Sequence, residues 1–237
     1  MIIIYLDVKT LLKEPFMTTV PSKPLSIAVF GAAGDVGKRI VAEATSRGHR
    51  VTAVVRRERP SSEMNPAVSI LVRDVQEATD LTNIAKRHDL VISALRPADG
   101  EEAKLVKLAS KVVEASRTSG TRFMVIGGAA PLLIPNSPHH TVLTAPDFLP
   151  EAYLPIANAC QELHDWILPK LGATGTHLCP PAMLVPGERT GTYRVSDDTL
   201  VVDDEGSSHI SMEDFAVAAI DEAEHPRHSG RRYTVGT

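Results

Sequence analysis

The strongest chemical signal in the sequence is a glycine-rich segment, Gly31-Ala32-Ala33-Gly34-Asp35-Val36-Gly37. It follows a short apolar run at 25–30 and precedes a helical pattern at 36–47, so it would join a strand to a helix. In such a turn the first glycine allows the tight bend, the second lets a pyrophosphate approach the backbone, and the third lets helix and strand pack closely. The helix would then offer free N–H groups and the positive end of its dipole to the phosphates. The alternative is an ordinary glycine-containing turn. The spacing and the flanking elements favour dinucleotide binding by Gly31, Ala33, Gly34, Asp35, Val36 and Gly37.

The residues after the next expected strand, at 51–55, bear on which dinucleotide would bind. An acidic side chain at this point would accept a hydrogen bond from the ribose 2′-hydroxyl of NAD. The chain instead has Arg56 and Arg57, whose guanidinium groups can pair with a 2′-phosphate through charge-assisted hydrogen bonds. The sequence therefore favours NADP(H) over NAD(H). The alternative is that Arg56, Arg57 and Arg59 are solvated loop charges.

Residues just beyond the later strands belong to the same predicted site. In a doubly wound parallel sheet the carboxyl ends of the strands line the ligand crevice. We therefore also expect cofactor contacts from Asp74, Val75, Ala94, Leu95, Arg96, Gly127, Gly128, Pro180 and Pro181. Asp74 could contact the adenine, and its alternative role is a turn or a helix cap.

The elements that must position these residues alternate along the chain. Helical periodicity is found between short apolar runs, which is the pattern of βαβ units and a parallel sheet. The expected strands are 25–30, 51–55, 68–72, 89–95 and 122–126, and the expected helices are 36–47, 76–87 and 101–119. The strands are almost continuously apolar, as expected when helices cover both faces of the sheet. The predicted fold class is α/β, a Rossmann doubly wound parallel sheet with helices on both faces and a small C-terminal substrate lobe.

The pattern loosens after Ile126. Residues 127–150 contain five prolines, which predicts a long loop without regular structure of the kind that is often functional. Beyond this loop we expect helices at 151–168 and 212–224 and short strands at 176–178 and 231–235. Residues 180–210, which contain acidic turns, are expected to form hairpin-like pieces. A capping box at 211–214 would open the last helix.

Two prolines near residue 24 divide the chain. Pro21 and Pro24 read as a linker, so residues 1–24 are expected to form an N-terminal extension. Residues 25–237 are expected to form a single NAD(P)-binding domain, to which residues 180–211 contribute the small substrate-side lobe.

Composition excludes several classes of partner. The chain has 237 residues with 43% hydrophobic and 23% charged side chains, which is ordinary for a globular protein. A net charge of −4 and 4% aromatic residues give no reason to expect nucleic acid or membrane as a partner. Two cysteines, Cys160 and Cys179, fit a reduced cytoplasmic setting. The neighbouring His139 and His140 lack further ligands at suitable spacing, so no metal site is expected. We expect a cytoplasmic monomer or dimer with a small-molecule partner.

Motifs from both halves of the chain resemble one family. The glycine turn, the Val-Val-Arg-Arg at 54–57, the Pro-Pro-Ala-Met at 180–183, the Pro-Gly-Glu-Arg-Thr-Gly at 186–191 and the Ile-Ser-Met-Glu-Asp at 210–214 occur in the family's order. The chain is similar over 25–237 to the atypical short-chain dehydrogenase/reductases, in particular the NAD(P)H-binding NmrA-like and NADH-flavin reductase families. The resemblance implies a Rossmann core and an NAD(P)H cofactor. Because members are also named as NAD-dependent epimerases or dehydratases, it does not identify the substrate.

The chain departs from the main-line enzymes of that group at the catalytic residues. Those enzymes use Tyr-x-x-x-Lys, whereas Tyr153 is followed four residues later by Ala157. Those enzymes also carry a serine after the fifth strand. The corresponding position falls near Gly127, Gly128 or Ala129, none of which is serine. Tyr153 is therefore a candidate catalytic residue only as a hydrogen-bond donor, and its alternative role is a surface tyrosine at a helix start.

Hydride transfer to a conjugated acceptor needs less side-chain chemistry, because the cofactor supplies the hydride and the protein supplies orientation and a dry pocket. We expect the pocket to be lined by Pro131, Leu132, Phe148 and Met183, although about half of such apolar residues are usually plain core. The predicted function is an NADPH-dependent oxidoreductase that reduces a flavin, quinone or similar small molecule, with the flavin as substrate rather than bound cofactor. One alternative is a non-catalytic NADP(H)-binding redox sensor with a protein partner. Another is a nucleotide-sugar epimerase or dehydratase, which Ala157 disfavours.

Overall fold

The computed structural model describes residues 23–57 and 67–237, and its centre is an eight-stranded sheet. The strand order is β10-β12-β8-β5-β4-β1-β2-β3, and every neighbouring pair is parallel except β10 with β12. The strands are β1 (Ser26–Phe30), β2 (Arg50–Val55), β3 (Ser69–Val72), β4 (Leu90–Ser93), β5 (Arg122–Ile126), β8 (Gly175–Cys179), β10 (Arg194–Ser196) and β12 (Arg232–Gly236).

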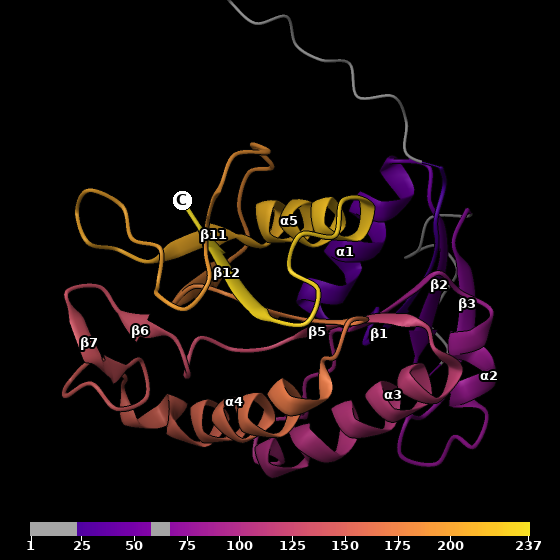
Figure 1. The fold of residues 1–237 in the computed structure, drawn as a ribbon, viewed down its shortest axis with the longest axis horizontal. Helices are drawn as coiled ribbons and strands as arrows, with labels where there is room; N and C mark the ends of the chain where they lie inside the picture. The colour runs from indigo at the N-terminus through magenta and orange to yellow at the C-terminus, as the bar shows by residue number, and fades with distance from the viewer. Residues whose placement is uncertain (1–22, 58–66) are drawn as a thin grey trace, which may run out of the picture.

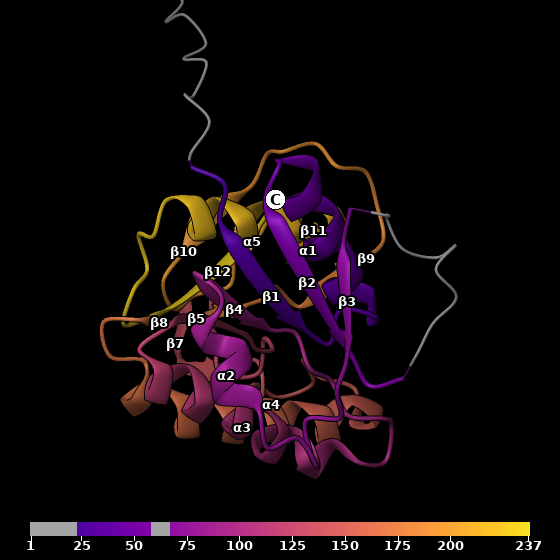
Figure 2. The same ribbon diagram turned by 90° about the vertical axis from the view of Figure 1, so that its right-hand side faces the viewer.

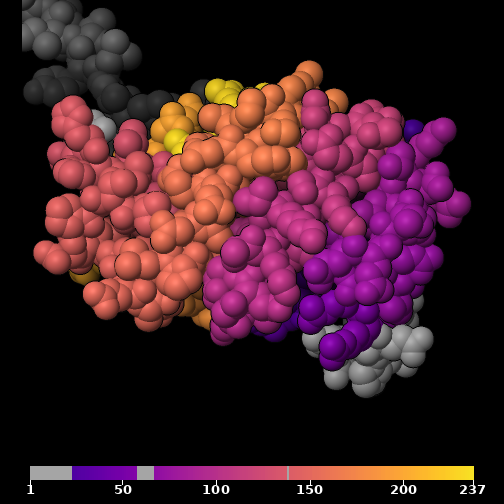
Figure 3. Space-filling view, turned by 90° about the horizontal axis from the view of Figure 1, so that it is seen from below, coloured from indigo at the N-terminus to yellow at the C-terminus, as the bar shows by residue number. Residues whose placement is uncertain are grey.

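Helices form a layer on each side of this sheet (Figures 1 and 2). One layer contains α1 (Asp35–Ser46) and α5 (Met212–Glu224), which pack against each other. The other contains α2 (Leu81–Lys86), α3 (Leu105–Ser119) and α4 (Leu154–Ile167), and Figure 3 looks onto its outer face. The predicted fold class, a doubly wound Rossmann sheet covered on both faces, is confirmed.

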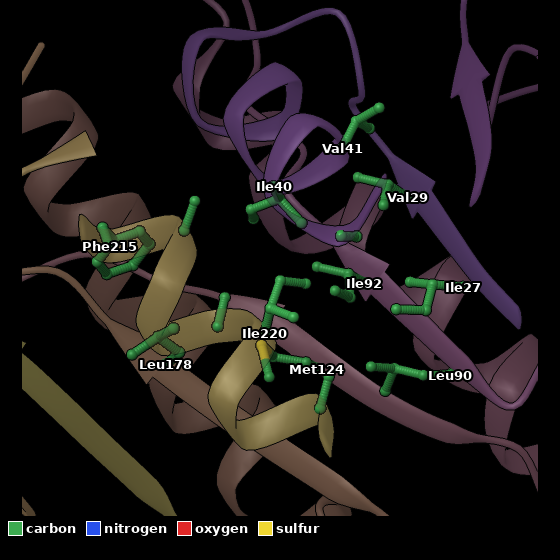
Figure 4. Packing of buried hydrophobic residues seen from close by; sticks show 14 of the residues in the cluster. Ile27, Val29, Ile40, Val41, Leu90, Ile92, Met124, Leu178, Phe215 and Ile220 are labelled. Atoms are coloured by element: carbon green, nitrogen blue, oxygen red, sulfur yellow. The ribbon is translucent and has the colours of Figure 1, made fainter. Parts of the chain in front are cut away.

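The core is divided by the sheet because side chains alternate between its faces. In β1, Ile27 and Val29 belong to the cluster beneath α1 and α5, and Ala28 and Phe30 to the cluster beneath the other helices. Figure 4 shows the first cluster, in which Ile40 of α1 and Phe215 and Ile220 of α5 lie over the strands. Strands β4 and β8 are buried along their whole length, as expected for central strands with helices on both faces of the sheet.

Two small sheets lie outside the main one. Strands β6 (Leu133–Ile134) and β7 (Ser137–Thr141) are antiparallel, and β9 (Met183–Val185) pairs in parallel with β11 (His209–Ser211). The prediction that 127–150 has no regular structure was therefore wrong. The β6–β7 turn places Asn136 at a φ of 61°, a left-handed conformation that asparagine tolerates better than most residues.

The hairpin-like pieces predicted for 180–210 were also wrong. Strand β9 finds its partner in β11, and β10 finds its partner in β12 near the end of the chain. Both partners are distant in sequence, so a local alternation of polar and apolar residues could not identify them.

Helix limits follow the local hydrogen bonding. Helix α5 has the predicted bounds, and the hydroxyl of Ser211 accepts a hydrogen bond from the backbone N–H of Asp214, as the predicted cap requires. Helix α2 is shorter than predicted. The stretch before it is a turn in which the carboxylate of Asp74 accepts from the N–H of Gln76 and the carbonyl of Asp74 accepts from Ala78.

The predicted N-terminal extension falls almost entirely outside the described residues. The division into an extension over 1–24, a domain over 25–237 and a lobe over 180–211 therefore stays a prediction. Within 23–57 and 67–237, no helix is long and apolar enough to cross a membrane.

Candidate cofactor site

The candidate site lies at the carboxyl edge of the sheet, between β1 and β4, where the strand order reverses. From β1 the chain passes through α1 to β2 on one side, whereas β4 lies on the other side of β1. The connections leaving β1 and β4 therefore diverge, and in doubly wound sheets this switch point is where the ligand crevice forms. Phe30 and Ser93, the last residues of the two strands, are register partners at this edge.

The structure itself requires the first and third glycines of the turn. Gly31 has a φ of +78°, and a Cβ there would lie within 3.0 Å of the carbonyl of Ala94. A Cβ on Gly37 would lie within 3.0 Å of the carbonyl of Gly31. The backbone N–H of Ala94 donates to the carbonyl of Phe30 over 2.9 Å, which holds the end of β4 against the turn.

Gly34 differs, because little in the protein occupies the space of its missing side chain. It precedes α1 with an extended backbone, it is exposed, and a Cβ would meet only the carbonyl of Gly31, at 3.3 Å. No side chain caps α1 among the described residues, so the first N–H groups of the helix, at Asp35, Val36 and Gly37, keep their hydrogen-bonding capacity. Bare backbone with free donors fits a pyrophosphate.

Positive side chains offset the carboxylate at the start of α1. Asp35 accepts a hydrogen bond of 2.6 Å from Lys38, and this bond lowers the pKa of Asp35 below its ordinary value. Arg39 lies 4.0 Å from the same carboxylate. The first turn of the helix therefore presents no unbalanced negative charge to a phosphate.

Arg56 and Arg57 directly follow β2 and are both exposed. They lie at the carboxyl edge of the sheet, on the far side of β1 from β4. Arg59, which the sequence interpretation also mentioned, lies outside the described residues.

Asp74 and Val75 follow β3. The carboxylate of Asp74 is engaged in the turn with Gln76, and Val75 is buried in the core beneath α2 and α3. The turn role considered for Asp74 therefore has a direct hydrogen bond in its support.

The remaining predicted cofactor residues follow the other central strands. Ala94, Leu95 and Arg96 follow β4, Gly127 and Gly128 follow β5, and Pro180 and Pro181 follow β8. All belong to the carboxyl edge of the sheet. The two prolines are buried, and Arg96 is exposed.

The two glycines after β5 are backed by a buried imidazole and a buried thiol. A Cβ on Gly127 would lie within 3.0 Å of Nε2 of His177, and one on Gly128 would lie within 3.0 Å of Sγ of Cys160. Side chains from β8 and α4 therefore fill the space that a serine at either position would need.

Burial keeps these groups neutral. It lowers the pKa of His177 to about 3 and raises the pKa of the Cys160 and Cys179 thiols to about 11 and 12. Near neutral pH the imidazole of His177 is therefore uncharged and the two thiols are protonated, so none of the three groups brings a charge to the site.

The predicted catalytic and pocket residues fall into two groups. Tyr153, Phe148 and Met183 are exposed, with Tyr153 at 57%. Tyr153 ends a short 3-10 helix, η3 (Glu151–Tyr153), that leads into α4. Pro131 is buried, and Leu132 is fully buried against Val142, Cys179 and Leu200. Leu132 is placed as a core residue, so we do not expect it to contact an acceptor.

Sequence reasoning missed a segment that clasps α1 and α5 together, here called the clasp (residues 186–193). The guanidinium of Arg189 donates two hydrogen bonds, of 2.7 and 2.8 Å, to the carboxylate of Glu43 on α1. The carboxylate of Asp214 on α5 accepts from Thr190 and from the N–H of Gly191, each at 2.7 Å. The signal was present in part in the Pro-Gly-Glu-Arg-Thr-Gly and Glu-Asp motifs, because the carboxylates of the second accept hydrogen bonds from the first. The partner of Arg189, Glu43, lies in neither motif.

The clasp also reaches the first turns of α1. Glu213 accepts from the N–H of Gly187 at 2.8 Å and from Arg39 at 2.5 Å. Arg39 lies two residues after the last glycine of the turn, so the clasp, α5 and the amino-terminal end of α1 form one hydrogen-bonded unit.

Comparison with known proteins agrees with this geometry. A family model described as NAD(P)H-binding matches residues 31–226. The uncharacterized protein YwnB of Bacillus subtilis is 36% identical over 214 residues, which are 89% of this chain and 98% of that protein.

Two solved structures are similarly close. One, a candidate epimerase of Bacteroides thetaiotaomicron, is 35% identical with a TM-score of 0.80, over 90% of this chain and 97% of that one. The other, a candidate NADH-flavin reductase of Streptococcus pneumoniae, is 34% identical with a TM-score of 0.77, over 90% and 99%.

Proposed function

Because the chain belongs to the NAD(P)H-binding family, we propose that it is an NADPH-dependent oxidoreductase that reduces a flavin, quinone or similar conjugated small molecule. The family membership confirms the resemblance drawn from the motifs of both halves. The observation that carries the proposal is the bare backbone at Gly34, which faces the switch point of the sheet beside the uncapped start of α1.

The surroundings of the β5 and β8 ends favour hydride transfer without protein acid–base chemistry. When bound, a reduced nicotinamide supplies a hydride. The protein contributes Gly127, Gly128, Pro180 and Pro181, which orient ligands and exclude water but exchange no proton. The neutral His177 behind them does not change this. An acceptor that can take its proton from solvent suits such a site.

The names of the relatives point in two directions, and Ala157 favours one of them. The Streptococcus pneumoniae protein is named for flavin reduction and the Bacteroides thetaiotaomicron protein for epimerisation. Ala157, at the position of the lysine in Tyr-x-x-x-Lys, is buried in the apolar core beneath α4. A lysine there would need a partner for its buried charge, which supports the reductase over the epimerase.

Arg56 and Arg57 support NADPH as the reductant. We expect the Arg56→Ala/Arg57→Ala double variant to bind NADPH about 10- to 100-fold more weakly, because the loss of each guanidinium removes charge-assisted hydrogen bonds to the 2′-phosphate. NADH affinity should change less than about threefold, since NADH has no 2′-phosphate. Titration calorimetry with both nucleotides measures the difference, and equal weakening of the two would show that these arginines do not read the phosphate.

Turnover is tested by mixing the protein with NADPH and a panel of flavins and quinones and following absorbance at the nicotinamide band. Oxidation of NADPH with at least one acceptor is expected. Tight NADPH binding with no oxidation across the panel would instead favour the redox sensor, for which the uncharged His177 and Cys160 behind Gly127 and Gly128 are the supporting observation.

A further inference from the structure

Arg96 lies at the carboxyl edge of the sheet, three residues after the end of β4. Its chain segment leaves β4 through Ala94, whose N–H is bonded to Phe30 and whose carbonyl lies against Gly31. The side chain of Arg96 is 69% exposed, and its ion pair is with Asp99, 3.4 Å away and 93% exposed. An exposed pair of this kind contributes little to stability, so the guanidinium can readily exchange Asp99 for another anion.

The negative charges of an NADP(H) molecule have partners elsewhere in the proposed site. The start of α1 serves the pyrophosphate, and Arg56 and Arg57 after β2 serve the 2′-phosphate. In the order β5-β4-β1-β2, Arg96 follows β4, on the opposite side of β1 from those arginines. Arg96, which the sequence analysis assigned to the cofactor, is therefore separated from the proposed 2′-phosphate site by β1 and lies on the side of β5.

That side is where the hydride acceptor must lie, next to the ends of β5 and β8. The positive charge of Arg96 reaches Cys160, where it acts against the burial that raises the pKa of the thiol. Sγ of Cys160 in turn backs Gly128 at the end of β5. Strand β4 lies between β1 and β5 in the sheet, so Arg96, three residues after the end of β4, lies between the glycine turn and the end of β5.

Exposed ring and thioether surfaces belong to the same edge of the sheet. Helix α4 runs into η4 (Leu168–Lys170) and then to the amino end of β8, so its beginning, with Tyr153, lies toward the carboxyl edge. The segment after Arg96 continues into η2 (Glu102–Lys104), which packs against α4. Phe148 precedes α4 and Met183 follows the Pro180-Pro181 pair, and both are exposed. A flat conjugated ring with an anionic tail matches exposed apolar side chains and an exposed guanidinium at the same edge of the sheet.

We propose that Arg96 is a specificity-determining residue that binds a phosphate or carboxylate on the hydride acceptor, which makes the preferred acceptor an anionic one, such as flavin mononucleotide rather than riboflavin. This inference rests on the proposed reductase function. The reaction balances with one hydride from NADPH and one proton from solvent, which convert the flavin to its dihydro form and leave NADP⁺. Arg96 takes part in binding and not in the transfer itself.

The experiment compares binding of flavin mononucleotide and riboflavin to the full chain saturated with NADP⁺, by calorimetry. The wild type should bind flavin mononucleotide at least about tenfold more tightly than riboflavin, the effect of one charge-assisted contact. Arg96→Ala should remove that difference by weakening flavin mononucleotide alone, and Arg96→Lys should restore part of it. The matched control is Arg117→Ala, which removes an exposed arginine with a similar i,i+3 partner, Glu114, on α3; it should keep the wild-type difference.

The outcomes separate this inference from the function on which it rests. Equal affinity of the wild type for the two flavins would overturn the inference. So would equal weakening of both flavins, or a matching loss of NADP⁺ affinity, in Arg96→Ala, because Arg96 would then serve the cofactor. If wild-type protein also oxidises NADPH with a neutral quinone, the reductase function stands although the inference has failed. Arg96-dependent binding of flavin mononucleotide without any turnover would leave the inference standing and remove the reductase.

Discussion

Replacing Gly34 by valine is expected to abolish the binding of both NADPH and NADH while leaving the protein folded. The valine side chain would occupy the space in front of the first N–H groups of α1, where the pyrophosphate must approach. Because Gly34 is exposed and only the carbonyl of Gly31 lies near its missing Cβ, the fold itself can accept the side chain. Calorimetry should show a loss of at least roughly 100-fold for either nucleotide, with a melting temperature within about 3 °C of the wild type.

Two further variants sharpen this result. Gly37→Ala should lower stability, because its Cβ would meet the backbone of Gly31. Ala173→Val changes an exposed turn residue before the amino end of β8, at the opposite edge of the sheet, and should leave both nucleotide affinities unchanged. If Gly34→Val still binds nucleotide with wild-type affinity, the pyrophosphate does not lie on this turn.

Replacing Glu43 by glutamine is expected to cost about 2–4 kcal/mol of unfolding free energy. The Glu43 side chain is 5% exposed and accepts hydrogen bonds from Arg47 within α1 and from Arg189 of the clasp. Glutamine keeps the shape but removes the charge, so two guanidinium groups lose their shared partner. Urea unfolding followed by circular dichroism measures the difference. Lys38→Gln, which breaks the exposed pair with Asp35, is the control and should cost less than about 1 kcal/mol.

The pH dependence of the unfolding free energy tests whether the charge of Glu43 is what stabilises the fold. Burial alone would raise the pKa of Glu43, but hydrogen bonds from Arg189 and Arg47 outweigh burial and hold the pKa below its ordinary value of 4.5. The stabilisation is therefore complete above about pH 4.5 and is lost as the pH falls through the lowered pKa of the folded state. The difference in unfolding free energy between wild type and Glu43→Gln should become smaller as the pH is lowered. A difference that stays constant would show that packing rather than charge is responsible.

The parallel sheet and the glycine turn could be predicted because their causes are local. A strand buried on both faces is continuously apolar, and a helix with one buried side repeats its apolar residues, so β1, α1 and β5 follow from nearby residues. Gly31 and Gly37 follow from the same logic, since a turn joining β1 to α1 leaves no room for a Cβ at either position. The capped start of α5 at Ser211 is likewise a short-range pattern.

What could not be predicted depends on partners that are distant in the chain. Strand β9 is a strand because of β11, and β10 because of β12. The ion pair of Glu43 and Arg189 joins residues 146 positions apart, and the sequence near Glu43 does not indicate it. The residues that line the acceptor pocket could not be predicted for the same reason. Leu132 and Met183 are both apolar, yet the fold buries Leu132 completely and exposes Met183.

The backing of Gly127 and Gly128 by His177 and Cys160 limits how this site could evolve. Alcohol-oxidising relatives depend on a hydroxyl at this end of β5, and a single change to serine at either glycine would collide with an imidazole or a thiol already in place. Acquiring that chemistry requires a second, space-making substitution on β8 or α4 at the same time.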